Sequence, residues 1–323
     1  MIEVENLTKR FPTQVAVADI SFSVQRGEIV GFLGPNGAGK TTAMRVLTGF
    51  LPPTAGTARV AGYDVVTRSL EARASLGYLP ESAALYPEMR VHEYLGYRAR
   101  LEGVSAAEVK KRVGEAIESC LLQEVAKRKV ENLSRGFRQR TALAGALVHQ
   151  PPVLILDEPT VGLDPGQIIR IRETIRSLGR ERAVLLSTHI LPEVDAVCDR
   201  VLIIDRGRIV AEGTAAELRS RLAGSPIVRV SLAGRVDAGE LASLPGVISV
   251  SQESDDDETR VRLECATDAD PREEIFRMAV ARGWTLRELA RERLSLEDVF
   301  VRLTRHEDVP PEGEPPPAEE VAQ

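Results

Sequence analysis

The sequence predicts an α/β fold with a parallel central sheet and a helical insertion, followed by a small α+β domain. Continuous apolar runs at residues 153–156, 183–187 and 201–205 are separated by helix-like segments, and strands buried on both faces of a parallel sheet need such runs. A further run at 28–33 leads into a glycine-rich turn and a helix-like stretch. The length of 323 residues suits one main domain and a smaller one.

Before the insertion, up to about Gly62, short alternating runs such as ISFSV are typical of half-buried strands. From about residue 71 to 131 the composition becomes helical. Apolar residues recur there at four-residue steps, which predicts one face of a helix: Val109, Val113, Ile117 and Leu121. We therefore expect a helical subdomain over about residues 82–150, inside a main domain of residues 1–223.

The end of the chain has three predicted parts. The run RVLIIDRGRIVAEG predicts a hairpin that turns at Arg206 and Gly207. After a Gly-Ser-Pro linker, short strands and two amphipathic helices in the order β-α-β-β-α-β predict a ferredoxin-like domain over residues 226–305, with a closing helix at 294–304. The tail, residues 306–323, is rich in Pro and Glu and is expected to be disordered.

Charge and composition exclude several classes of function. The net charge is −6, and the tail at 306–323 carries six acids and no Lys or Arg, so the rest of the chain is neutral on balance. Nucleic acid needs a clustered basic surface, so we expect no nucleic-acid partner. No export signal and no run of 18 apolar residues is present, and the three cysteines show no CxxC spacing. These features predict a cytoplasmic chain that does not cross a membrane.

The segment GPNGAGKT at residues 34–41 matches the nucleotide P-loop and stands between an apolar run and a helix-like stretch. Its glycines allow backbone N–H groups to surround a phosphate. Lys40 is expected to reach the β- and γ-phosphates, and the Thr41 hydroxyl to bind Mg²⁺. The predicted phosphate-binding residues are Gly34, Asn36, Gly37, Ala38, Gly39, Lys40, Thr41 and Thr42.

Two carboxylates close the VLIL run, at the strand edge where open α/β sheets bind ligands. Asp157 is predicted to hold Mg²⁺ through water and Glu158 to polarise the attacking water; the alternative is two solvated charges at a strand end. His189 closes the AVLLS run in the same way. It is either a hydrogen-bond donor to the γ-phosphate or a structural histidine, and the sequence leaves both open.

With these motifs in place, the chain resembles the ATP-binding cassette (ABC) ATPase family over about residues 1–223. LSRGFRQR at 133–140 is similar to the family's signature, VGLDP at 161–165 to its D-loop, and Thr188 with His189 to its switch histidine. The resemblance implies a P-loop NTPase cassette with an antiparallel β subdomain, which binds ATP and Mg²⁺ and hydrolyses ATP. It also implies that Phe11 stacks on adenine.

The signature also has an interpretation from the residues alone. Ser134 and Gly136 precede an Ala- and Leu-rich helix, whose positive N-terminus favours an anion; a helix cap without function is the alternative. The resemblance implies that this end binds the γ-phosphate on a second copy. It further implies nucleotide contacts from Ser134, Gly136 and the D-loop residue Asp164, in a head-to-tail homodimer or pseudo-dimer.

The chain departs from the family pattern at three positions. Glu81 stands where Gln is usual in the Q-loop, and Arg135 and Phe137 replace the signature's Gly and Gln. Glu81 can still bind Mg²⁺, although a carboxylate beside phosphates is repulsive unless the metal or a proton compensates.

The chain also resembles the export and gliding-motility branch of the family. This resemblance implies a subunit at the inner face of the cell membrane that drives a separate integral-membrane permease. Three tyrosines and a methionine suit either a groove for a partner helix or core packing: Tyr86, Tyr94, Tyr97 and Met89. A soluble cassette ATPase and an ATP-gated interaction switch are the alternative functions.

Overall fold

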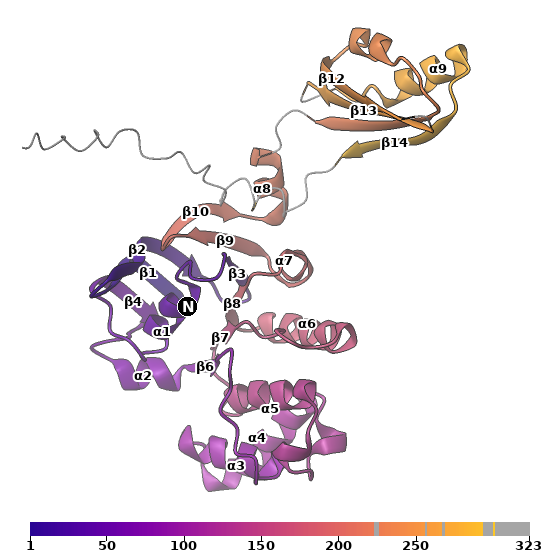
Figure 1. The fold of residues 1–323 in the computed structure, drawn as a ribbon. Helices are drawn as coiled ribbons and strands as arrows, with labels where there is room; N and C mark the ends of the chain where they lie inside the picture. Colours follow the sequence, from indigo (N-terminus) through magenta and orange to yellow (C-terminus); the bar gives the residue numbers. More distant parts are fainter. Residues whose placement is uncertain (223–225, 256, 267–268, 293–299, 301–323) are drawn as a thin grey trace, which may run out of the picture. The chain divides into compact units, whose positions relative to one another are not determined.

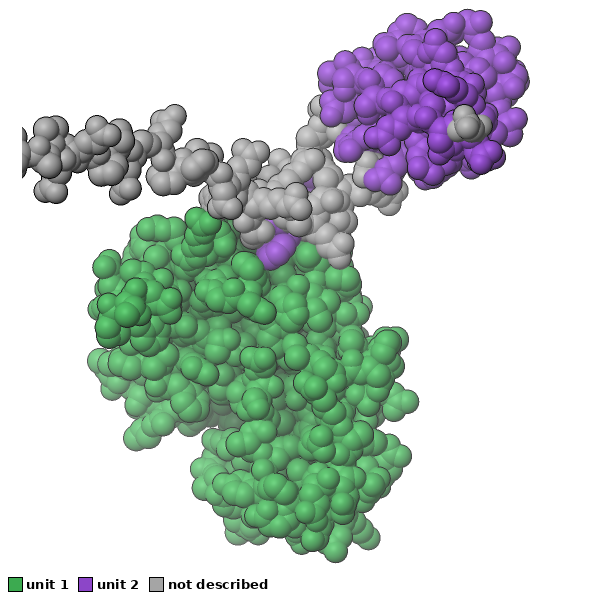
Figure 2. Space-filling model, in the orientation of Figure 1, with its two compact units in different colours: residues 1–215, 303–323 green, residues 216–302 purple. Residues whose placement is uncertain are grey.

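The protein is described as a computed structural model over residues 1–222, 226–255, 257–266, 269–292 and 300 (Figure 1). These residues form two compact units, one within residues 1–215 and the other within 216–302 (Figure 2). Each unit has its own hydrophobic core. The predicted limits of the domains at residues 223 and 226 stay predictions.

A six-stranded sheet forms the centre of the first unit, in the order β10-β9-β3-β8-β7-β6. The strands are β3 (Ile29–Leu33), β6 (Leu76–Leu79), β7 (Val153–Asp157), β8 (Ala183–Thr188), β9 (Arg200–Asp205) and β10 (Arg208–Gly213). All neighbours pair in parallel except β9 and β10. Every residue of β3, β7 and β8 is buried, as the continuous apolar runs predict.

Helices lie on both sides of this sheet (Figure 1). They are α1 (Lys40–Leu47) on one side and α6 (Pro165–Gly179) and α7 (Leu191–Val197) on the other. The β9–β10 turn has positive φ at Arg206 (46°) and Gly207 (77°). The predicted hairpin is therefore confirmed, because two such residues form the turn that fits the twist of a hairpin.

Strand β6 contradicts the predicted helical character of residues 71–131. It follows α2 (Ser69–Ala74) and pairs in parallel with β7. A run of four residues is too short to show a strand period. A Cβ at Gly77 would lie 2.2 Å from the Ala146 carbonyl oxygen, so this strand needs glycine where the following helical layer approaches it.

An antiparallel sheet completes the first unit beside α1, in the order β2-β1-β4-β5. Its strands are β1 (Ile2–Phe11), β2 (Gln14–Val24), β4 (Ala55–Val60) and β5 (Tyr63–Asp64). Their alternating inward residues share one core with α1, including Leu7 and Met44, which are fully buried. This is the predicted antiparallel β subdomain.

The helical layer consists of α3 (Val91–Leu101), α4 (Ala106–Ser119) and α5 (Arg135–Leu147), with short 3₁₀ turns at Gln123–Val125 and Val130–Asn132. It packs around a second core that contains Leu95, Leu122 and Leu143. Of the predicted apolar face of α4, Val109 is buried as expected, but Leu121 is 44% exposed. The helix ends at Ser119 and Leu121 has a φ of 54°, so its side chain leaves the stripe.

The second unit begins with α8 (Ala215–Leu222) and continues with a four-stranded antiparallel sheet in the order β12-β13-β11-β14. Its elements are β11 (Ile227–Ala233), a 3₁₀ turn (Gly239–Ser243), β12 (Val247–Ser254), β13 (Glu258–Cys265), α9 (Arg272–Arg282) and β14 (Leu286–Glu292). This confirms the ferredoxin-like strand order, with a 3₁₀ turn in place of the first helix. The predicted helix at 294–304, apart from Phe300, and the tail at 306–323 lie outside the described residues.

Candidate functional site

The glycine-rich loop joins β3 to α1, as the sequence predicts. Gly37 and Gly39 have φ of 82° and 108°, which glycine adopts without strain. A Cβ at Gly39 would lie 2.3 Å from the Ala16 carbonyl oxygen of β2, so the close approach also requires glycine. No side chain caps α1 at Gly39, and its first N–H groups can therefore receive an anion. Three other predicted residues lie on this loop and first turn: Asn36, Ala38 and Thr42.

Lys40 begins α1 and is only 6% exposed. Its Nζ donates hydrogen bonds to the carbonyl oxygens of Gly34 (2.8 Å) and Pro35 (3.2 Å) and lies 3.6 Å from Glu158 Oε1. Burial of an ammonium group is costly unless it is paired and hydrogen-bonded. The fold thus maintains one positive charge beside the glycine-rich loop.

Asp157 ends β7 and is 1% exposed. Its Oδ1 accepts hydrogen bonds from Thr41 Oγ1 at 3.4 Å and Ser187 Oγ at 2.5 Å, and the Glu158 N–H donates to Ser187 Oγ at 2.9 Å. Hydroxyl and carboxylate oxygens are the ligand types that Mg²⁺ prefers, so this group fits a magnesium ion. Sequence reasoning missed Ser187, although it stands next to Thr188 at the end of a predicted neighbouring strand.

Glu158 follows the strand with a φ of 48°. A non-glycine residue in this conformation is strained, and such strain is concentrated at functional sites. The turn brings Glu158 Oε2 to 2.9 Å from His189 Nδ1, while Oε1 faces Lys40. His189 is thus joined to the predicted base, and its side chain is 45% exposed against 8% for Glu158.

Side chains of the signature helix α5 donate hydrogen bonds to the segment that follows Glu158. Gln139 Nε2 donates to the Pro159 carbonyl oxygen at 3.1 Å, and the Arg135 guanidinium donates to the Val161 carbonyl oxygen at 3.1 Å. Gly162 has a φ of 72°, and a Cβ there would lie 2.0 Å from Arg135 Cζ. The arginine that departs from the family signature therefore covers the D-loop of its own chain.

The same segment is held from α7 by Glu193, which is 2% exposed. Its carboxylate accepts hydrogen bonds from the Thr160 hydroxyl and, at 2.7 Å, from Thr188 Oγ1, and lies 3.7 Å from the Arg172 guanidinium. Glu193 thus links the residues that follow Glu158 to the residue that precedes His189. It was missed from the sequence because α7 gives no motif that separates it from an ordinary helix.

The start of α5 stands apart from the P-loop. Ser134 is its N-cap and accepts from the Phe137 N–H at 3.4 Å. Gly136 packs against Gln167 of α6, where a Cβ would lie 2.3 Å from the Gln167 side chain; Asp164 caps α6 by accepting from the Gln167 N–H at 2.9 Å. Within the described residues, the Ser134 hydroxyl has no hydrogen bond to the P-loop.

Two further predicted residues lie at the edges. Phe11 ends β1, is 37% exposed and has Lys9 Nζ 5.4 Å from its ring centre. Glu81 is exposed two residues beyond β6, whose neighbour β7 ends at Asp157. Both side chains are exposed, and their predicted contacts with nucleotide and metal stay predictions.

A groove of about 1110 Å³ is lined by residues of α1, α2, β6 and the helical layer. Phe50 and Leu70 line it and are 70% and 72% exposed. Tyr94 lines it too but is 5% exposed, while Tyr86 is 41% exposed and stacks on it at 6.3 Å. Core packing therefore holds for Tyr94, whereas Tyr86 reaches the surface and a groove for a partner helix stays a prediction.

Comparison with known proteins covers nearly the whole chain. The family description "ABC transporter" matches residues 17–161, and "ATP-binding protein DrrA1-3-like, C-terminal domain" matches residues 213–304. The chain is 34% identical to the linearmycin resistance ATP-binding protein LnrL of Bacillus subtilis (strain 168), over 94% of this chain and 98% of that protein. This chain belongs to the ABC transporter ATP-binding family.

Further relatives place this ABC protein near its export branch. It is 35% identical to the daunorubicin resistance ATP-binding protein DrrA3 of Streptomyces coeruleorubidus, over 94% of this chain and 95% of that protein. It is 38% identical to the Nod factor export ATP-binding protein I of Paraburkholderia xenovorans (strain LB400), over 95% and 97%. ABC ATP-binding proteins bind and hydrolyse ATP, which agrees with the P-loop geometry described above.

Solved structures match the ABC cassette. The "Structure of ATP binding subunit of ABC transporter" has a TM-score of 0.63 and 32% identity, over 68% of this chain and 92% of that chain. The "Dimeric Structure of MJ0796, a Bacterial ABC Transporter Cassette" has a TM-score of 0.60 and 25% identity, over 66% and 98%. Among the described residues of this chain, no helix has the length and apolar character needed to cross a bilayer.

Proposed function

We propose that two copies of this chain bind Mg²⁺ and ATP between them and hydrolyse ATP to drive a separate membrane permease. Lys40 and the loop N–H groups bind the phosphates, and Thr41 and Asp157 hold Mg²⁺, which neutralises phosphate charge when bound. Exposed Glu81 is a further oxygen ligand. Glu158 polarises the attacking water, and His189 orients this carboxylate.

The position of the signature supports a shared site. Ser134 is exposed at the start of α5, and within the described residues its hydroxyl has no hydrogen bond to its own P-loop. The positive end of a helix favours an anion, and a second copy placed head to tail supplies the γ-phosphate. Asp164 and Phe11 complete the nucleotide contacts in this arrangement. The similar solved cassette whose title names it a dimer agrees with this proposal.

The groove beside the helical layer supports a membrane partner. Its exposed apolar residues form a concave surface that suits an amphipathic helix. The named relatives serve antibiotic resistance and Nod factor export, and we extend export to this chain. The nucleotide-binding domain, residues 1–223, then works at the inner face of the cell membrane, where it couples closure of the dimer to the permease.

The Glu158→Gln variant tests the catalytic proposal. It keeps the size of the side chain and removes the base, so ATP binding is retained while turnover falls about 10²–10⁴-fold and an ATP-bound dimer accumulates. Phosphate release and light scattering after size-exclusion chromatography measure the two effects. Hydrolysis at the parent rate would exclude Glu158 as the base.

The Phe50→Glu variant tests the groove. A charge at this exposed apolar position prevents docking of an apolar helix, so a multispanning protein that co-purifies with the parent from solubilised membranes is lost. ATP hydrolysis by the isolated subunit stays unchanged. Val280→Glu, at a 67% exposed position on α9, is the matched control. If no membrane protein accompanies even the parent chain, a soluble ATPase replaces the transporter subunit as the function.

A further inference from the structure

A hollow lined mainly by basic residues lies beside the start of α3, where Arg90 meets the segment 127–132. Its volume is about 640 Å³, and its five lining residues include four cations: Arg90, Lys127, Arg128, Lys129 and Asn132. They come from two segments that the fold holds together. Val91 N–H donates to the Arg128 carbonyl oxygen at 3.1 Å, and Val130 N–H donates to the Met89 carbonyl oxygen at 3.0 Å. These backbone hydrogen bonds therefore fix the positions from which the cationic side chains extend.

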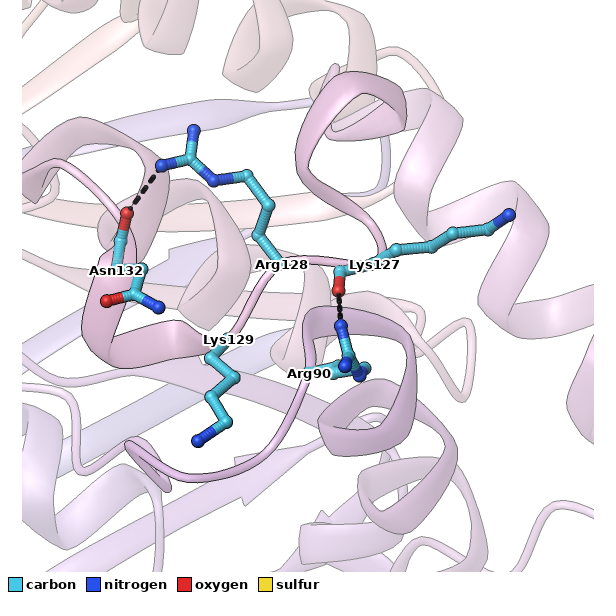
Figure 3. Close-up of a pocket in the computed structure, with 5 residues that line it drawn as sticks. All are labelled: Arg90, Lys127, Arg128, Lys129 and Asn132. Atoms are coloured by element: carbon cyan, nitrogen blue, oxygen red, sulfur yellow. Dashed lines mark hydrogen bonds between the residues drawn. The ribbon is translucent and has the colours of Figure 1, made fainter.

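Both guanidinium groups are anchored to neutral backbone oxygens. Arg128 donates to the Asn132 carbonyl oxygen at 2.9 Å, and Arg90 donates to the Lys127 carbonyl oxygen. Figure 3 shows these two bonds and the Lys127 side chain, which extends away from the other cations. An arginine has five N–H donors, so each guanidinium keeps several donors for a ligand after its backbone bond is made.

The hollow carries an excess of positive charge. Lys129 pairs with Glu131 at 3.2 Å, whereas no carboxylate in the described part of the chain forms an ion pair with Arg90, Lys127 or Arg128. The nearby Glu93 carboxylate accepts a hydrogen bond from the Arg90 backbone N–H at 2.8 Å. Three of the four cations thus lack an ion-pair partner among the described residues, on a chain whose net charge is −6.

We propose that this hollow binds a phosphate group, presented either by an anionic lipid headgroup or by a soluble phosphate ester. A single guanidinium can bind phosphate with two parallel N–H···O bonds. The Asn132 amide adds a neutral donor beside the two arginines. The site is separate from the P-loop and has no part in ATP hydrolysis. Occupation by a lipid headgroup would anchor the helical layer to the anionic face of a membrane.

Flotation of the full-length protein with vesicles tests the lipid source. The parent is expected to float with vesicles that contain phosphatidylglycerol and to remain behind with pure phosphatidylcholine. Arg90→Gln combined with Arg128→Gln reduces partitioning onto the anionic vesicles by roughly fivefold for each cation removed. Lys110→Gln combined with Lys111→Gln, which removes the same charge from the exposed side of α4, leaves partitioning close to that of the parent. Equal losses in the two double variants would show attraction by net charge alone and overturn the proposal.

Glycerol phosphate tests the soluble source. The measurement is made by calorimetry in a Lys40→Ala background, which removes the P-loop lysine. If this protein binds glycerol phosphate and loses that binding when Arg90 and Arg128 are also changed to Gln, the hollow binds a soluble ester. If neither vesicle flotation nor calorimetry detects binding that depends on the two arginines, the proposal is wrong. ATP hydrolysis by the variant with only the two arginine changes remains at the parent rate, so failure here is distinguishable from failure of the proposed ATPase.

Discussion

The P-loop end of the sheet and the signature end of α5 satisfy their polar groups in different ways. At the first, Lys40, Asp157 and Glu158 are buried, and each contacts another member of the site. At the second, Ser134 and Arg135 are exposed, and the hydrogen bonds of their side chains in the described structure go to backbone groups of their own chain. The side chains of the first region contact one another within one chain, whereas the proposed function assigns to the second the phosphate of another copy.

The largest effect is expected when two inactive variants are mixed, because this tests whether the P-loop of one chain works with the signature of another. Lys40→Ala removes phosphate binding, and Ser134→Arg blocks the helix end. Each variant alone loses about 10²–10³-fold in turnover, as expected when a group that stabilises phosphate charge is removed. A heterodimer of the two regains one intact site, because the P-loop of one chain meets the signature of the other.

Steady-state phosphate release by the mixture measures this recovery. Each variant mixed with itself is the control and stays inactive. Absence of recovery, with mixed dimers demonstrated by differently tagged chains, would mean that the signature serves its own chain, and the shared site would be wrong.

A smaller effect is expected where Glu193 joins the two ends of the catalytic segment. Glu193→Gln weakens the hydrogen bonds that Thr160 and Thr188 donate to a charged acceptor, each worth about 1.5–3 kcal/mol. We expect kcat to fall roughly tenfold, with an unchanged dissociation constant for ATP, because Glu193 positions Glu158 and His189 without contact with the nucleotide. Glu173→Gln, on the exposed side of α6, is the control. An equal loss in ATP affinity would indicate general disruption of the fold.

The smallest effect is expected at the contact between the signature and the D-loop. Arg135→Gln removes one exposed hydrogen bond to the Val161 carbonyl oxygen, worth about 1 kcal/mol, so turnover falls about two- to fivefold. Gly162→Ala displaces the same guanidinium, since the added Cβ would occupy its place. The double variant is expected to lose no more than Gly162→Ala alone. Additive losses would show that Arg135 acts elsewhere.

Much of the fold and part of the site could be predicted from short stretches of sequence. The loop at residues 34–41 and the carboxylates at Asp157 and Glu158 are contiguous motifs that end apolar runs, and the structure brings Lys40, Thr41, Asp157, Glu158 and His189 together. The roles of these residues stay predictions. Strand β6 escaped notice because four residues carry too little periodicity.

The sequence by itself determined the nucleotide loop, the buried parallel strands and most of the order of elements in the second unit, because each depends on residues that are neighbours along the chain or repeat with a regular period. Only the tertiary structure decided the partners of Ser187, Glu193 and Arg135. These contacts join residues 21 to 33 positions apart, apart from the link between Glu193 and Thr188. Such contacts depend on how strands and helices pack, and no local pattern records the side chain that a distant element will meet.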